Sequence, residues 1–271
     1  MRAQDQLFDR RLGRLRRARA ARSGGGGFYL HRRAADELIE RLDLVARPFR
    51  AALDLSLDPY LAGRLRERGL EVVAGGEEDL PGHAGAFDLV TSVGLIDTIN
   101  DLPGALALIR RALRADGLFL AAFAGAGSLP RLKRAMRAAE EAQGSGAAPR
   151  IHPQIDVRAA GDLLTRAGFA LPVADRDVLD VRYGGLMQLV GDLRAMAATN
   201  QLAGQAGRPL GRSGLAAAIA DFAAGAGPDG KTAERFEIIH MSGWAPAPGQ
   251  PQPARRGSAT ASLAEALKPR N

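Results

Sequence analysis

Cysteine is absent from the 271 residues, lysine occurs only three times, and aromatic residues make up 5% of the chain. The lack of cysteine excludes disulfide bonds, cysteine-based zinc sites and thiol catalysis. No apolar run approaches the roughly 18 to 20 residues that cross a bilayer. The basic N-terminus is not followed by the apolar core of a signal peptide, so we expect none. These absences favour a cytoplasmic protein, with peripheral contact at the inner membrane as an alternative.

Positive charge is present but concentrated in one place. The formal net charge is +7, and residues 1–22 carry eight arginines against two aspartates, which gives +6. Because the remainder is nearly neutral, this segment predicts a basic arm that meets an acidic protein or an anionic membrane surface. A solvated helix in an arginine-rich protein is the plainer alternative. Only the positive charge points to a nucleic-acid partner, and we do not expect one.

Apolar strand patterns alternate with amphipathic helix patterns along most of the chain. Strands are predicted at 51–55, 70–74, 87–92, 115–123 and 234–244, and helices at 31–46, 59–68, 102–113, 157–169, 184–199 and 213–224. This alternation predicts an α/β fold with a mostly parallel sheet covered on both faces. Such sheets bind ligands beyond the carboxyl ends of their strands, so the chemistry is expected there.

Composition divides the chain into three expected parts. Residues 1–27 form the basic arm and a glycine hinge, and residues 28–245 form one domain with a helical insertion at about 184–224. A proline-rich tail, residues 246–271, is expected to be mobile. The apolar cluster Phe28-Tyr29-Leu30 should dock the chain onto the domain directly after the hinge.

Several motifs carry a resemblance to a known family. The stretches "FDLVTS", "NDLPGALALIRRALRADGLFLAAF" and "DLLTRAGF" resemble the later half of a class I S-adenosylmethionine-dependent methyltransferase. A narrower set is similar to the family of respiratory complex I assembly factor 5, whose nearest relatives are the malonyl-carrier-protein methyltransferases. That set is "FDRRLGRLRRARAA", "NDLPGAL", "GGLMQLVGDLRAMAATN", "HMSGW" and "RRGSATASL".

The resemblance covers nearly the whole chain and implies a Rossmann-like methyltransferase fold. It also implies S-adenosylmethionine as cofactor and arginine hydroxylation of a complex I subunit during assembly. The implied partner is a respiratory complex subunit or a paralogue. If the cofactor is bound, the resemblance implies that these positions contact it: Asp54, Ser56, Glu77, Glu78, Ser92 and Gly94.

The loop after the first strand departs from the family pattern Asp-x-Gly-x-Gly-x-Gly. Asp54 keeps its place, but Ser56, Asp58 and Tyr60 stand where the family has glycine. Glycine lets the backbone approach a ligand closely because it has no Cβ. Pro59 removes a backbone donor, and Asp58 would add negative charge near the cofactor's carboxylate. The loop therefore predicts a plain strand-turn-helix connection without a ligand.

A second departure is a shortfall in length. Only the segment 69–86 separates the first helix from "FDLVTS", where the family has two strands with a helix between them. We therefore expect a sheet with one strand-helix unit fewer. The missing unit carries the acidic residue that holds the ribose hydroxyls in doubly wound folds. The acidic run Glu77-Glu78-Asp79 follows the surviving strand and is not assumed to replace that residue.

Three residues are candidates for the substrate or partner side: Asn100, Asp101 and His152. Relatives usually carry a His-Trp pair where this chain has Asp97-Thr98. Asp101 also fits the N-cap of the following helix, and His152 also fits a surface or hydrogen-bonded histidine. None of the four histidines pairs at the helical i, i+4 spacing, so no metal site is expected.

Two functional hypotheses remain open. One is a methyltransferase-like assembly or scaffolding factor that has lost its cofactor site and has no cofactor. The other is an active S-adenosylmethionine-dependent methyltransferase, or arginine-modifying enzyme, that acts on a protein or carrier protein. The altered loop and the missing unit favour the first, because micromolar cofactor affinity needs about −8 kcal/mol of binding free energy. No catalytic residue is assigned for either hypothesis.

Overall fold

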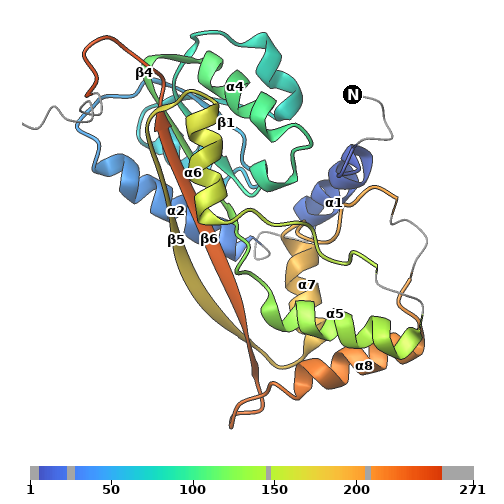
Figure 1. Cartoon of the computed structure of the whole chain (residues 1–271). Helices are drawn as coiled ribbons and strands as arrows, with labels where there is room; N and C mark the ends of the chain where they lie inside the picture. Colours follow the sequence, from blue (N-terminus) through green and yellow to red (C-terminus); the bar gives the residue numbers. More distant parts are fainter. Residues whose placement is uncertain (1–5, 23–27, 145–147, 205–208, 252–271) are drawn as a thin grey trace, which may run out of the picture.

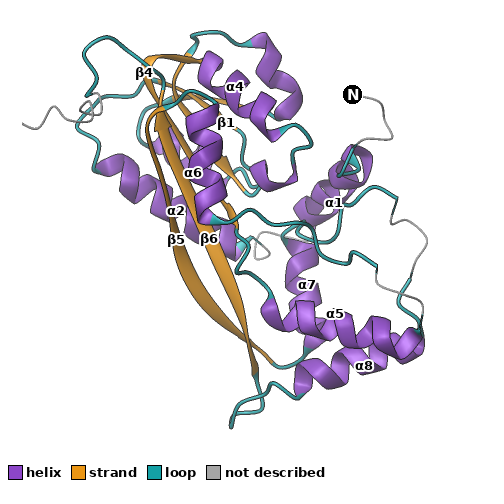
Figure 2. Ribbon diagram, in the orientation of Figure 1, coloured by secondary structure: helices purple, strands orange, loops and turns teal. Residues whose placement is uncertain are grey.

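The computed structural model describes residues 6–22, 28–144, 148–204 and 209–251. A six-stranded sheet lies at its centre in the order β2-β1-β3-β4-β6-β5, and of these strands β6 alone runs opposite to the others (Figure 2). The strands are β1 (Ala51–Asp54), β2 (Glu71–Ala74), β3 (Phe87–Val93), β4 (Leu113–Ala124), β5 (Ala170–Tyr183) and β6 (Thr232–Trp244). The predicted α/β class and mostly parallel sheet are confirmed.

Helices cover both faces of the sheet because successive strand side chains point to opposite sides. Leu53 and Val90 pack in the core that includes α4 and α6, whereas Ala52 and Leu89 pack in the core that includes α2 and α3. The bounds of these helices are α2 (Tyr29–Asp43), α3 (Tyr60–Glu67), α4 (Leu102–Ala112) and α6 (Val157–Arg166). The central strands are therefore buried on both sides, as expected for a parallel sheet.

Three further helices form a layer beyond the carboxyl edge of the sheet (Figure 1). They are α5 (Pro130–Gln143), α7 (Leu186–Ala195) and α8 (Arg212–Ala223). Helix α5 runs beside α8, and Phe222 and Leu189 are fully buried against Phe236 of β6. The helical insertion predicted at 184–224 thus corresponds to α7 and α8, and α5 joins them.

The N-terminal arm packs on the domain. Helix α1 (Arg10–Arg22) contacts α7, and Phe8 and Ala20 are buried. Phe28 packs with Ala20 and Ala197, so the apolar cluster after the hinge docks as predicted. The glycine hinge itself, residues 23–27, lies outside the described residues.

The described start of the tail also contacts the domain. Gln250 Nε2 donates hydrogen bonds to Asp116 Oδ1 and to the Ala245 carbonyl, at 2.7 and 3.0 Å. The remaining tail, residues 252–271, lies outside the described residues, and the mobility expected for it stays a prediction.

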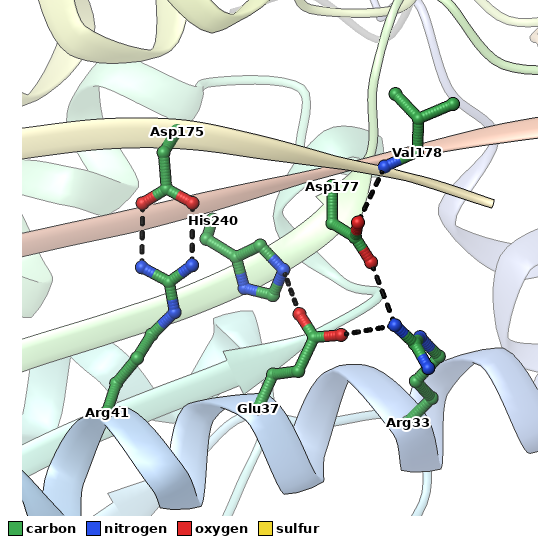
Figure 3. Close-up of polar contacts among 7 residues, drawn as sticks. All are labelled: Arg33, Glu37, Arg41, Asp175, Asp177, Val178 and His240. Carbon is green, nitrogen blue, oxygen red and sulfur yellow. Dashed lines mark hydrogen bonds and ion pairs between the residues drawn. The ribbon is translucent and has the colours of Figure 1, made fainter.

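A charged network fixes α2 to strand β5 (Figure 3). Both terminal guanidinium nitrogens of Arg41 donate to Asp175 at 2.6 Å, and Arg33 lies 3.1 Å from both Glu37 and Asp177. The buried His240 of β6 lies 2.8 Å from Glu37, and burial lowers its pKa to about 4. His240 is therefore neutral at neutral pH, and the arginine-aspartate pairs hold α2 in place. The same helix contributes residues to the candidate site.

The shortened sheet agrees with the length argument. Between β2 and β3 the chain forms only a short 3-10 helix, Glu77–Gly82, and no strand. Two elements were missed from the sequence, the edge strand β5 and helix α5. In β4, Asp116 adopts a left-handed φ of 60°, where a turn had been predicted, and the strand continues through it.

Candidate functional site

Two cavities lie side by side at the carboxyl edge of the sheet. The arm-covered cleft, about 390 Å³, is lined by Ser56, Glu77 and Glu78 of the domain and by Arg10, Arg14 and Arg17 of α1. The apolar cavity, about 400 Å³, is lined mainly by Leu132, Met136, Leu186, Leu193, Phe236 and Ile238. Leu57, Thr98 and Gln201 line both cavities, so they form the wall between the two.

Asp54 ends strand β1, and its carboxylate is hydrogen-bonded to neighbouring side chains. Its Oδ1 accepts hydrogen bonds from the Ser56 hydroxyl at 2.6 Å and from the Thr91 hydroxyl at 2.8 Å. Burial raises the pKa of the Asp54 carboxyl, and these hydrogen bonds oppose that shift. Asp54 lines neither cavity, so the predicted cofactor ligand lies behind the cleft and not in it.

The backbone donors of the turn after β1 are also occupied. The N–H groups of Leu55 and Leu57 donate to the carbonyls of Thr91 and Val93 in β3, at 2.8 and 3.1 Å. The Ser56 N–H donates to Asp54 Oδ1 at 3.3 Å. A loop that cradles an anion needs free backbone N–H groups. This turn instead extends the β1–β3 pairing.

Two side chains of the turn are placed differently from the expectation. Asp58 is buried and its Oδ2 accepts from Arg32 of α2 at 2.8 Å, while Tyr60 donates its hydroxyl to Asp36. Neither lines the cleft, so the predicted repulsion by Asp58 and the predicted filling by Tyr60 are corrected. Arg32 neutralises Asp58, and Leu57 is the neighbouring turn residue that lines the cleft.

The acidic run after β2 meets the arm. Arg10 lies 2.6 Å from Glu77, and the charges of Glu77 and Glu78 raise the pKa of Arg17, which burial lowers more strongly. Glu77 and Glu78 line the cleft, and their role as cofactor ligands stays a prediction. Their charge is balanced by arginines of the chain's own N-terminus.

Asn100 fastens the arm to the domain. It accepts a hydrogen bond from the Phe8 N–H at 2.8 Å and donates one to the Phe8 carbonyl at 2.9 Å. The Asp9 N–H donates to the Gln201 carbonyl, which ties the arm to the segment after α7. Asp101, the residue after Asn100, accepts a hydrogen bond from the Gly104 N–H and caps α4. Both residues make structural contacts in this structure, and the substrate-side role predicted for them stays a prediction.

His152 and Gly94 belong to the apolar cavity. His152 Nε2 accepts from the Gln201 N–H at 3.0 Å, and its ring stands edge-on to Phe8. Burial lowers the pKa of His152 below its usual value. Gly94 was predicted on the cofactor side, yet it faces His31 in the cavity, where a Cβ would lie 2.4 Å from His31 Nε2. Its φ of +75° adds a second reason for glycine there.

Three further polar groups stand out. Ser92 is fully buried in β3 and lines neither cavity, so the structure does not bring it to the cleft. Asp97 and His31 line the apolar cavity, and Asp97 Oδ1 and His31 Nδ1 are buried without a hydrogen-bond partner. Burial raises the pKa of Asp97 to about 7 and lowers that of His31 to about 4. The sequence signal for Asp97 was its place in an altered motif, and His31 had none.

These residues do not fit S-adenosylmethionine. The turn offers no free N–H at 55, 56 or 57, Asp54 is hydrogen-bonded internally, and α1 covers the cleft. Within the described ranges no cluster of metal-ligating side chains occurs. No helix of the described chain is long and apolar enough to cross a membrane.

Comparison with known proteins gives consistent similarities. A methyltransferase domain model matches residues 41–121. The chain is 34% identical over 246 residues to the mitochondrial arginine-hydroxylase NDUFAF5 of Danio rerio, covering 90% of this chain and 74% of the relative. It is 30% identical to the malonyl-(acyl-carrier protein) O-methyltransferase of Laribacter hongkongensis, covering 83% and 73%. A putative methyltransferase structure from Bacillus halodurans aligns with a TM-score of 0.48 at 15% identity, covering 78% and 99%.

Proposed function

Because the chain belongs to the class I methyltransferase family that includes the NDUFAF5 arginine-hydroxylases and the malonyl-carrier-protein methyltransferases, we propose that it is an assembly or scaffolding factor without a bound cofactor. Its client is a protein, and by resemblance a subunit of respiratory complex I. The observation that carries this proposal is the turn 55–57, whose N–H groups are all hydrogen-bonded within the chain.

The polar balance of the cleft supports the same function. Glu77 is paired with Arg10, and Asn100 holds Phe8 through two hydrogen bonds. A cofactor that displaced these contacts would find the N–H groups of 55, 56 and 57 already hydrogen-bonded. Each lost hydrogen bond to Phe8 contributes about 0.5–1.5 kcal/mol, which opposes the exchange.

The alternative is an active enzyme whose arm opens to admit S-adenosylmethionine. It is favoured by one observation, since the cleft retains about 390 Å³ and two glutamates in its wall. That volume lies within the range of small-molecule pockets, about 300–1,000 Å³.

Calorimetry and thermal shift on the full chain separate the two. We expect no heat and no shift with millimolar S-adenosylmethionine or S-adenosylhomocysteine, both for the wild type and for Asn100→Ala, which loosens the arm. A dissociation constant below about 50 μM in the wild type, weakened by Glu78→Gln, would sink the proposal. Binding that appeared only in Asn100→Ala would replace it with a gated cofactor site.

The exposed faces of α1 and α8 are proposed as the partner surface. Leu15 and Ile219 are 59% and 41% exposed, and Arg11 and Arg22 are exposed beside Leu15 on the same helix. An apolar side chain among arginines suits a partner with an acidic rim around an apolar centre. The arginines would steer association, which makes its rate dependent on salt.

Two matched double variants test this surface. Arg11→Gln with Arg22→Gln should lower co-purification of the client at low salt and flatten its salt dependence. The control double variant, Arg158→Gln with Arg166→Gln, removes the same charge from α6. It should leave co-purification of the client and its salt dependence unchanged. Equal losses in the two variants would remove α1 from the partner surface and would indicate a general charge effect.

A further inference from the structure

The apolar cavity is a separate ligand site by its construction. It lies between the ends of β3 and β4 and the layer of α5, α7 and α8, and about 400 Å³ is accessible within it. Met187 of α7 and Leu215 of α8 belong to its lining and are 51% and 39% exposed. Apolar walls of this size favour an apolar guest, because burial removes both surfaces from water.

Two residues of the cavity lining carry polar atoms without a hydrogen-bond partner. Asp97 Oδ1 is inaccessible to solvent and accepts no hydrogen bond, and His31 Nδ1 is also buried and forms none. Native structures leave few buried polar atoms unpaired, and each such atom marks a place for a missing partner. The neighbouring Thr98 hydroxyl cannot serve Asp97, because it donates to the Leu95 carbonyl at 2.9 Å.

We propose that the apolar cavity binds a small apolar amine, whose ammonium group pairs with Asp97 and whose hydrocarbon body fills the space beneath α5, α7 and α8. The carboxylate supplies the charge-assisted acceptor, and the leucine and methionine walls exclude water around the pair. This site is distinct from the arm-covered cleft and does not depend on whether a cofactor binds there.

The charges around Asp97 favour a cation over an anion. The other titratable residues in the lining are His31 of α2, Arg150 and His152 of the segment before α6, and Arg194 of α7. Arg150 is paired with Glu140 at 2.6 Å, and Arg194 is exposed. Burial keeps both histidines neutral at neutral pH, since it lowers their pKa values. Arg194 is therefore solvated, whereas a carboxylate guest with its charged end beside Asp97 would meet a like charge.

Three probes with one hydrocarbon body test the proposal on the full chain: cyclohexylmethylamine, cyclohexylmethanol and cyclohexanecarboxylate. By calorimetry at pH 8 we expect the amine to bind at least about tenfold more tightly than the alcohol, a difference of about 1.4 kcal/mol. The carboxylate should bind most weakly. Equal affinities, a preference for the carboxylate, or no binding of the amine would overturn the proposal.

Three variants test whether the ammonium group of the amine pairs with Asp97. Asp97→Asn keeps the shape but removes the charge, so it should weaken the amine about tenfold and change the alcohol by less than about twofold. Asp162→Asn on the exposed face of α6 removes an equal charge elsewhere and should leave all three affinities unchanged. Val190→Phe should fill the cavity and weaken both the amine and the alcohol. An amine preference that survives Asp97→Asn would contradict the assignment.

The pH profile provides an independent readout. Amine affinity should rise between pH 6 and pH 8 as Asp97, with its pKa of about 7, ionises. The pKa of His31, at about 4, lies below this interval, burial lowers the pKa of His152, and the two arginines stay charged. The profile should be flat in Asp97→Asn, and a rise that persists there would assign it to another group.

Discussion

The arm-covered cleft and the apolar cavity have similar volumes, about 390 and 400 Å³, and share the wall made by Leu57, Thr98 and Gln201. They differ in what happens to their polar groups. In the cleft, Glu77 and the turn after β1 are paired with other parts of the chain. In the cavity, Asp97 remains unpaired among apolar side chains. Available hydrogen-bonding capacity, more than volume, distinguishes a ligand site from a closed surface.

The walls of the two regions should also differ in how they are stabilised. Phe222→Ala removes a fully buried ring from the layer beyond the apolar cavity and should cost about 3–5 kcal/mol of unfolding free energy. Urea denaturation measures this cost. The control Ile219→Ala, at a 41% exposed position of the same helix, should cost less than about 1 kcal/mol. Similar small costs would mean that the helical layer is only loosely attached.

Asp97→Asn should change stability in a pH-dependent way. The folded-state pKa of Asp97, about 7, lies above its ordinary value of 3.8, so folding disfavours the ionised form. This cost is absent below about pH 4 and develops as pH rises to 7. The asparagine variant should therefore be more stable than the wild type by on the order of 4 kcal/mol at pH 8, and close to equal at pH 4.

Denaturation at the two pH values measures this difference, with Asp162→Asn as the control that shows none. An Asp97→Asn variant that is less stable at pH 8 would show that the carboxylate has a partner in the folded protein. The apolar cavity would then resemble the cleft in this respect.

Asn100→Ala should loosen the cover of the cleft. It deletes both hydrogen bonds to Phe8, and each contributes about 0.5–1.5 kcal/mol. Amide exchange in residues 6–22 should accelerate by about tenfold while the central strands remain protected. Arg10→Gln removes only an exposed ion pair and should have a smaller effect, below about 1 kcal/mol. The reverse order would mean that charge, and not the Asn100 contact, holds the arm.

Much of the fold could be predicted because its central elements are locally encoded. Strand β3 carries Phe87, Leu89, Val90 and Val93, and α4 carries both its apolar period and its cap at Asp101. Strand β5 was missed because aspartates interrupt its pattern at 175, 177 and 180. Arg41 and Arg33 of α2 compensate the first two, from positions more than 130 residues away in the chain.

The site was less predictable for the same reason. Ser56, Glu77 and Glu78 were correctly expected to share one edge of the sheet, since parallel strands bring their carboxyl ends together. The partners of these residues come from distant segments, such as Arg10 for Glu77. Asn100 and Phe8, 92 residues apart, show no pattern that marks them as contacts. Burial of Asp97 depends on helices that follow it by more than 30 residues.

The hydroxyl of Ser56 has a consequence for the stability of this turn. It donates to Asp54 and accepts from the Val93 N–H at 3.0 Å, so it adds a side-chain link to the backbone pairing between the turn and β3. Mutation of Ser56 to glycine would leave the Val93 N–H unpaired before any ligand could compensate. A glycine at this position would therefore lower the stability of the unliganded protein, and a ligand would have to offset that loss.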